Sequence, residues 1–171
     1  MKSFLLLAVS VSTMLFACGQ GDKSKRASPP ALAKETIGSG AVVTIDYSQP
    51  SVKGRTIGKN LEPMPGKVWR TGANEATVFE VSQAVKVEGK DLPAGKYALF
   101  TIANEDAWTI IFNKTWKQEG AANYKEADDA LRVKVKPGKA DQFSEKMTFI
   151  VNKNGTVSLL WGDIKVDFTV A

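Results

Sequence analysis

The densest group of side chains that could do chemistry lies in the short segment from Trp69 to Glu75 (WRTGANE). Arg70 presents a planar guanidinium that suits a carboxylate, and Trp69 offers a flat apolar face on which a sugar ring can stack. Asn74 and Glu75 add a carboxamide and a carboxylate. The segment also has a structural interpretation, in which Arg70 pairs with Glu75, Asn74 takes a left-handed turn position and Trp69 fills the core. The sequence alone leaves both interpretations open.

Two further groups supply candidates for binding. Asp46, at the end of a predicted strand, is placed to orient an arginine or to bind a ligand hydroxyl, or else to hydrogen-bond its own backbone. Trp116 and Tyr124 lie in the least regular part of the chain, where they either line a groove or cap one end of the core. The candidate ligand-binding residues are Asp46, Trp69, Arg70, Asn74, Glu75, Trp116 and Tyr124.

The residue types that are missing exclude several kinds of chemistry. The chain of 171 residues contains no His and one Cys, which excludes Ser-His and Cys-His hydrolases and an intramolecular disulfide. The acids near position 126 lack the spacing of a helix–loop–helix calcium site. We predict no catalytic residue, metal or cofactor. Two alternatives to a non-enzymatic binding domain remain. One is a His-free glycan hydrolase that uses Glu75 and Asp46 as paired carboxylates, and the other is a purely structural protein.

The N-terminus indicates export and a lipid anchor. Residues 4–17 form an uncharged run of 14 residues, which is too short to span a membrane but fits a secretory signal. The following Cys18 resembles the lipidated residue of a bacterial lipobox, which receives a diacylglycerol and a further acyl chain such as palmitate. The alternatives are an ordinary secretion signal, with Cys18 as a chance residue, and a core helix. The signal and Cys18 together predict a bacterial cell envelope protein. Because no acid follows Cys18 directly, we favour the outer membrane over the inner.

The sequence divides into three parts. We predict a signal peptide over residues 1–17, a lipidated Cys with a flexible tether over 18–34, and a single domain over 35–171. The alternative for the tether segment is an extra strand docked on the domain. The formal charge of +5 is concentrated before the domain, since residues 35–171 carry 18 Lys and Arg against 17 Asp and Glu. Such a balanced domain offers no electrostatic footprint for nucleic acid. The predicted partners are the membrane, through Cys18, and an envelope glycan, peptidoglycan fragment, peptide or protein.

Apolar residues in the domain alternate with polar ones in short runs, which predicts strands. Asn154-Gly155 predicts a hairpin with positive φ at both residues, and Gly162-Asp163 predicts a tight reversal. Residues 117–129 tolerate at most one short helix. The pattern therefore predicts an all-β fold, an antiparallel β-sandwich or barrel-like domain of about nine strands. The predicted strands are residues 41–47, 77–81, 84–87, 96–102, 108–113, 131–136, 147–152, 157–161 and 164–170.

Five sequence blocks in order resemble one known family. They are VTIDYSQPSVKGRTI (43–57), GKVWRTGANEAT (66–77), LPAGKYALFTI (92–102), WTIIFNK (108–114) and LRVKVKP (131–137). These passages are similar to the domain-of-unknown-function 2911 family of secreted and lipid-anchored bacterial proteins. The resemblance implies a compact β-rich envelope domain and no established activity. The lipid anchor, the predicted sandwich and the Trp and Tyr residues in loop-like stretches instead predict a non-enzymatic binding or interaction domain of undetermined oligomeric state.

Overall fold

The computed structural model describes residues 22–171, so the predicted signal peptide and Cys18 lie outside the described residues. These residues form an all-β fold of antiparallel strands with two short 3-10 turns, η1 and η2. The prediction of an all-β sandwich is confirmed, and the sheets do not close into a barrel. The elements in order are η1 Lys23–Lys25, β1 Pro30–Thr36, β2 Val42–Ser48, β3 Val68–Trp69, β4 Thr77–Val81, β5 Val85–Val87, β6 Lys90–Leu92, β7 Gly95–Ala103, β8 Trp108–Asn113, η2 Glu126–Asp128, β9 Asp129–Val135, β10 Pro137–Val151 and β11 Thr156–Thr169.

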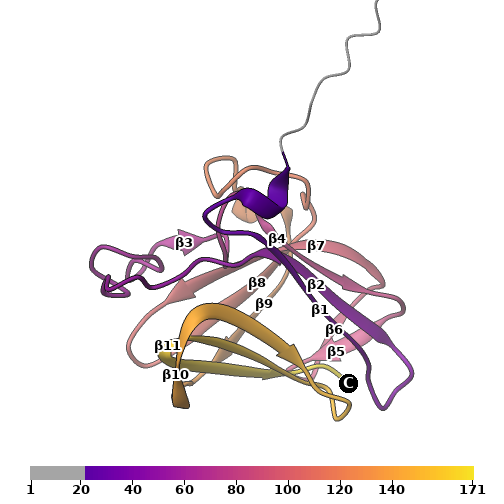
Figure 1. The fold of residues 1–171 in the computed structure, drawn as a ribbon. Helices are drawn as coiled ribbons and strands as arrows, with labels where there is room; N and C mark the ends of the chain where they lie inside the picture. The colour runs from indigo at the N-terminus through magenta and orange to yellow at the C-terminus, as the bar shows by residue number, and fades with distance from the viewer. Residues whose placement is uncertain (1–21) are drawn as a thin grey trace, which may run out of the picture.

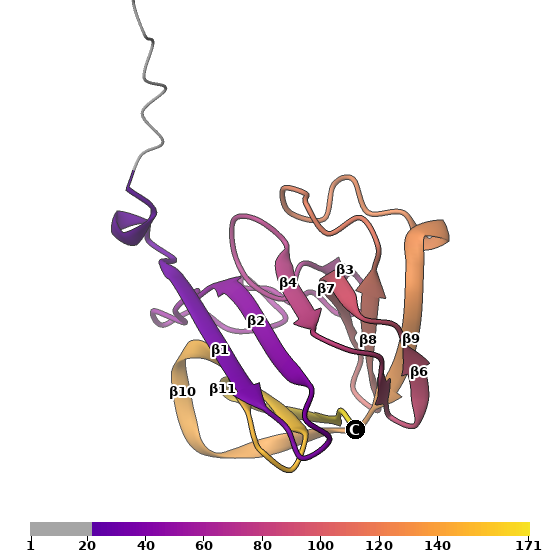
Figure 2. The ribbon, with the colours of Figure 1, turned by 90° about the vertical axis from the view of Figure 1, so that its right-hand side faces the viewer.

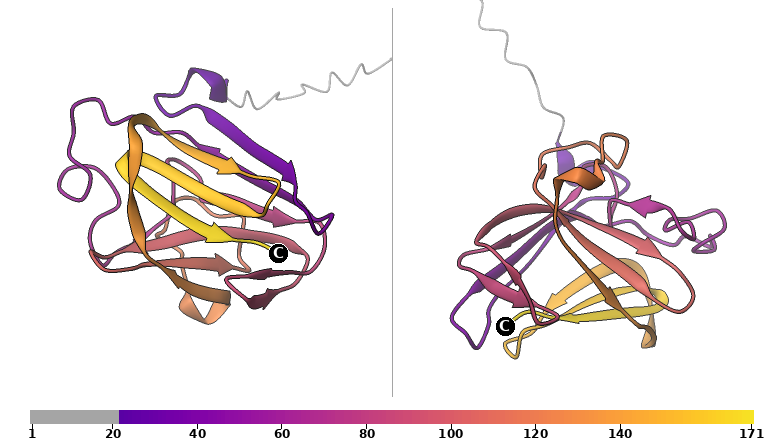
Figure 3. Two further views of the ribbon diagram at one scale, coloured as in Figure 1. Left: turned by 90° about the horizontal axis from the view of Figure 1, so that it is seen from below. Right: turned by 180° about the vertical axis from the view of Figure 1, so that it is seen from behind.

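One large sheet and one long hairpin form the two layers. The large sheet has the order β1-β2-β4-β7-β8-β9, with β3 paired to β7. The β10–β11 hairpin lies across one face of this sheet (Figures 1 and 3). Phe79 from β4 and Phe112 from β8 meet edge to face at 4.9 Å, and Phe168 from β11 contacts both rings. Burying each such ring stabilises the fold by about 2 to 3 kcal/mol.

Asn154-Gly155 lies in the predicted hairpin turn between β10 and β11. Only Gly155 has a positive φ, of 86°, because Asn154 instead accepts a hydrogen bond from the Thr156 N–H through its side chain at 3.0 Å. Gly155 also packs tightly, since a Cβ built on it would lie 2.0 Å from the Val170 carbonyl oxygen. This turn therefore requires glycine for both its conformation and its lack of a side chain.

The tight reversal predicted at Gly162-Asp163 is wrong. β11 continues through both residues, and Gly162, with φ of 60°, lies where the register with β10 shifts. A glycine in this conformation bends a strand at a bulge without ending it. Residues 117–129 form no α-helix, and the helical residues among them are those of the short 3-10 turn η2.

The segment predicted as a tether contains a strand of the large sheet. β1 pairs with β2 from Pro30 opposite Ser48 to Thr36 opposite Val42 (Figure 2). Ala31 and Ala33 face the core, but their small side chains give little hydrophobic signal in the sequence. Residues 30–34 therefore belong to the domain, which begins before Glu35. Within residues 22–171 the structure has no helix long and apolar enough to cross a membrane.

Candidate functional site

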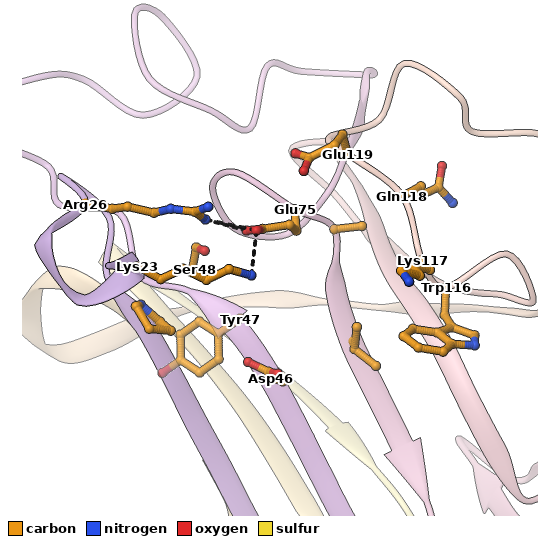
Figure 4. A pocket seen from close by; sticks show the side chains of 13 residues that line it. Lys23, Arg26, Asp46, Tyr47, Ser48, Glu75, Trp116, Lys117, Gln118 and Glu119 are labelled. Atoms are coloured by element: carbon orange, nitrogen blue, oxygen red, sulfur yellow. Dashed lines mark hydrogen bonds and ion pairs between the residues drawn. The ribbon is translucent and has the colours of Figure 1, made fainter. Parts of the chain in front are cut away.

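A cleft of about 570 Å³ opens at one end of the sandwich, between the N-terminal turn and the loop after β8 (Figure 4). This end lies opposite the β10–β11 hairpin (Figure 1). Asp46, Tyr47 and Ser48, at the end of β2, line one side, and residues 116–119 line the other. Glu75 lies between them, where two cations from the N-terminal segment reach it.

Glu75 is held by both cations. The Arg26 Nη1 atom donates to both carboxylate oxygens at 2.9 Å, and the Lys23 Nζ atom lies 3.0 Å from one of them. Burial raises the pKa of the carboxyl group, but hydrogen bonds from its own backbone, Arg26 and Lys23 together outweigh that effect and lower the pKa to about 2. Glu75 is therefore a fixed anion at neutral pH.

Local backbone geometry brings Glu75 to the cleft. Thr71 and Asn74 both take left-handed conformations, with φ of 52° and 57°. A Cβ on Gly72 would lie 2.8 Å from the Thr77 hydroxyl, so the loop can approach β4 only with glycine at this position. Trp69 is 2% exposed, and its indole N–H donates to the Gly72 carbonyl at 3.1 Å. The loop is thus built around a buried indole rather than around a ligand-facing one.

The loop after β8 is joined to the Glu75 loop by backbone hydrogen bonds. The Ala76 N–H donates to the Gln118 carbonyl at 3.0 Å, and the Gly120 N–H donates to the Asn74 carbonyl at 3.2 Å. This pairing fixes the wall of the cleft that carries Trp116. The Trp116 side chain remains partly exposed, at 39%, and the Lys96 ammonium lies 5.3 Å from its ring centroid.

Arg70 does not pair with Glu75. Its guanidinium has no ion pair and no hydrogen-bond partner among residues 22–171, and its Nε atom is buried. Asn74 donates from its side chain to the Ser28 carbonyl at 3.1 Å. The structural interpretation of this segment is therefore right about Trp69 and Asn74 and wrong about the predicted ion pair.

Tyr124 lies away from the cleft, on the outer face of the large sheet. Its ring packs against Phe100 at 5.0 Å, and its hydroxyl donates to Asp129 at 2.7 Å. Arg132 binds the same carboxylate through its Nε atom at 2.6 Å. Burial and the neighbouring Asp129 carboxylate raise the pKa of Tyr124 to about 12. This network anchors the loop after β8 to the sheet.

The structure thus brings together three of the predicted residues, Asp46, Glu75 and Trp116, and places the other four elsewhere. Sequence reasoning missed Lys23 and Arg26, which it assigned to a tether. Arg26 and Glu75 are 49 positions apart in the chain, and no local sequence pattern indicates a contact between such distant residues. Residues 22–171 contain no group of three or more acidic or Cys side chains arranged to hold a metal ion.

Fold and cleft together define a small all-β protein of sandwich-like architecture with its candidate site at one end. Residues 28–170 match the model of the family described as "Protein of unknown function (DUF2911)", and the chain belongs to that family. The match confirms the family resemblance of the five sequence blocks. A search of curated proteins found no match, and neither did a search of solved structures.

Proposed function

We propose that this protein is an envelope lipoprotein whose domain binds an uncharged glycan in the end cleft without cleaving it. The observation that carries the proposal is the partly exposed Trp116 ring in a cleft large enough for a sugar unit or more. Sugar rings present apolar faces that stack on an indole, and hydroxyls that hydrogen-bond to polar neighbours.

The charges in the cleft favour a neutral ligand. Three cations and three carboxylates line it, and the Glu75 carboxylate is already neutralised by Lys23 and Arg26. A site without excess charge has little preference for an ionic ligand, whereas its donors and acceptors suit hydroxyl groups. The exposed Asp46 carboxylate is the best placed acceptor for a sugar hydroxyl, because no ion pair occupies it in the described structure. The charged residues are Lys23, Arg26 and Lys117, and Asp46, Glu75 and Glu119.

A second candidate function is glycan hydrolysis, since Asp46 and Glu75 line one cleft as a carboxylate pair must. Such an enzyme needs one carboxylic acid that stays protonated near neutral pH, and Glu75 has a lowered pKa instead. Its lone pairs are also engaged by Arg26 and Lys23. These contacts favour binding over cleavage.

The proposed lipid anchor at Cys18 would bring the cleft close to a membrane. The chain enters the domain at the cleft end (Figure 1), and Asp22 is the first described residue. Four residues of chain span at most about 14 Å. A lipidated Cys18 would therefore hold the ligand-binding end toward the lipid surface, which suits a ligand attached to or lying near that surface. Mass spectrometry of the full chain and of a Cys18→Ser variant tests the anchor, because only the former should carry acyl groups.

Calorimetric titration of the full chain in mild detergent tests the binding. Neutral oligosaccharides should bind, and Trp116→Ala should abolish that binding while the fold is retained. Lys67→Gln, an exposed cation outside the cleft, serves as the control. Binding of charged peptides alone, or glycan binding that Trp116→Ala leaves unchanged, would contradict the proposal. Release of reducing ends that Glu75→Gln abolishes would favour the hydrolase.

A further inference from the structure

A second hollow, of about 260 Å³, is lined by the part of the same loop that precedes Glu75, from Trp69 to Ala73. Arg55 and Arg70 both line it, together with the side chains of Asn60 and Ser28. Apart from Glu62, the rest of the lining is apolar and includes the buried indoles of Trp69 and Trp161 and several aliphatic residues. The hollow therefore combines two guanidinium groups with an apolar interior.

Neither arginine has a carboxylate partner. No ion pair to Arg55 or Arg70 forms among residues 22–171, and residues 1–21 contain no Asp or Glu. Arg55 donates its Nε hydrogen to the Val52 carbonyl at 3.1 Å and an Nη2 hydrogen to the Ser51 carbonyl at 2.5 Å, so much of its guanidinium is satisfied by the chain. Arg70 has no such partner, and its Nε atom is buried.

An unpaired, partly buried guanidinium is unusual, since removing a charge from water costs free energy unless a partner replaces the water. The Arg70 guanidinium lies close to the backbone of Gly120, since a Cβ built on that glycine would lie 3.2 Å from the Arg70 Nη1 atom. The only acid that lines the hollow is Glu62, and one of its oxygens already accepts a hydrogen bond from the Met64 N–H at 2.7 Å. The hollow therefore has an excess of positive charge, and the unused donors are those of Arg70.

We propose that this hollow binds the carboxylate of a small organic acid or of a peptide C-terminus, with Arg70 as the main anchor. A guanidinium offers two parallel N–H donors that match the two carboxylate oxygens. Asn60 adds a donor through its side-chain NH₂ group, while its side-chain oxygen accepts a hydrogen bond from the Thr56 N–H. The apolar body of the ligand packs against the indole walls. This site is separate from the glycan cleft and does not depend on the function proposed for it.

Calorimetric titration of the full chain with N-acetyl-leucine tests the proposal, with the uncharged amide of the same compound as the matched probe. The acid should bind, and the amide should bind roughly tenfold or more weakly, since it lacks the charge that Arg70 recognises. Arg70→Met, which keeps an apolar stem, should weaken binding of the acid by a similar factor. Arg70→Lys should also weaken it, because an ammonium lacks the fork. Lys67→Gln should bind as the unaltered chain does.

Equal binding of acid and amide, or unchanged binding by Arg70→Met, would overturn the proposal, as would the absence of saturable binding at millimolar concentration. Inorganic phosphate is the further control, and binding of phosphate as tight as that of the acid would show a general anion site instead. A tetrapeptide that ends in leucine distinguishes the two sources of carboxylate, since tighter binding assigns the hollow to peptide C-termini and weaker binding to free acids. Melting temperatures of the two Arg70 variants show whether a loss of binding reflects a loss of fold.

Discussion

The Nη1 atom of Arg26 lies 2.9 Å from each of the two carboxylate oxygens of Glu75. This contact joins the start of the described chain to the loop that forms the cleft. It makes residues that precede the first strand part of the site, and it keeps Glu75 from acting as a proton donor.

Glu75→Gln should reduce the pH dependence of stability at acidic pH. The pKa of Glu75 is about 2 in the folded protein, below its ordinary value of 4.5, so its contribution is present above about pH 4.5 and is lost as the pH falls toward 2. A third of the side chain is exposed, so the contribution is at most about 1 kcal/mol and should fall with salt. Urea unfolding at pH 3 and pH 7 measures it. Glu105→Gln, at an exposed position, is the control, and an identical pH profile in the two variants would contradict the assignment.

Trp116→Ala and Trp69→Ala should separate binding from stability. Trp116 is 39% exposed in the cleft, so its loss should abolish glycan binding with a stability change below about 1 kcal/mol. Trp69 is 2% exposed, so its truncation should destabilise the fold by about 3 to 5 kcal/mol. Denaturant unfolding and titration of both variants make the comparison. A large loss of stability in Trp116→Ala would instead assign that ring to the core.

Gly155→Ala should destabilise the domain far more than Gly40→Ala. Both glycines have nearly the same φ, 86° and 85°, so both variants bear a backbone strain of about 1 to 2 kcal/mol. Only Gly155 adds a clash, because its Cβ would lie 2.0 Å from the Val170 carbonyl oxygen while nothing lies within 4 Å at Gly40. Melting temperatures measure the difference, and equal losses would show that the Val170 segment moves aside freely.

Arg70→Met should leave the ligand-free protein as stable as before, or more stable, because the guanidinium has no protein partner to lose. Arg132→Met is the matched comparison, since its Nε atom donates to Asp129 at 2.6 Å and its loss should cost about 2 kcal/mol. Chemical unfolding without ligand tests both. A loss at Arg70 as large as that at Arg132 would indicate a structural partner for Arg70.

A chain that begins at residue 37 should fold poorly. It lacks β1, which pairs with β2 over seven residues, and it exposes the β2 edge to other molecules. A chain that begins at residue 22 keeps the strand and the Glu75 contacts. Comparison of their solubility and unfolding cooperativity tests the point, and equal behaviour would show that β1 contributes little to the fold.

Much of the fold could be predicted because alternation and turn residues act locally. Strands such as Thr77–Val81 and Trp108–Asn113 have the predicted bounds, since a period of two in hydrophobicity directly reflects which side chains face the core. The strand β1 could not be recognised in this way. Its core-facing residues are alanines, and it is held by backbone hydrogen bonds, which leave no mark on residue type.

The sequence by itself determined the all-β class, the family, most strands, and a set of candidate residues from which Asp46, Glu75 and Trp116 meet in one cleft. Its prediction of a lipid anchor at Cys18 lies outside the described residues and stays a prediction. Only the tertiary structure decided that Glu75 pairs with Lys23 and Arg26 and that Arg70 lines a separate hollow. The physical reason is separation along the chain. Side-chain patterns reflect interactions between residues close together in a strand, whereas ion pairs and cavities depend on how distant segments come together.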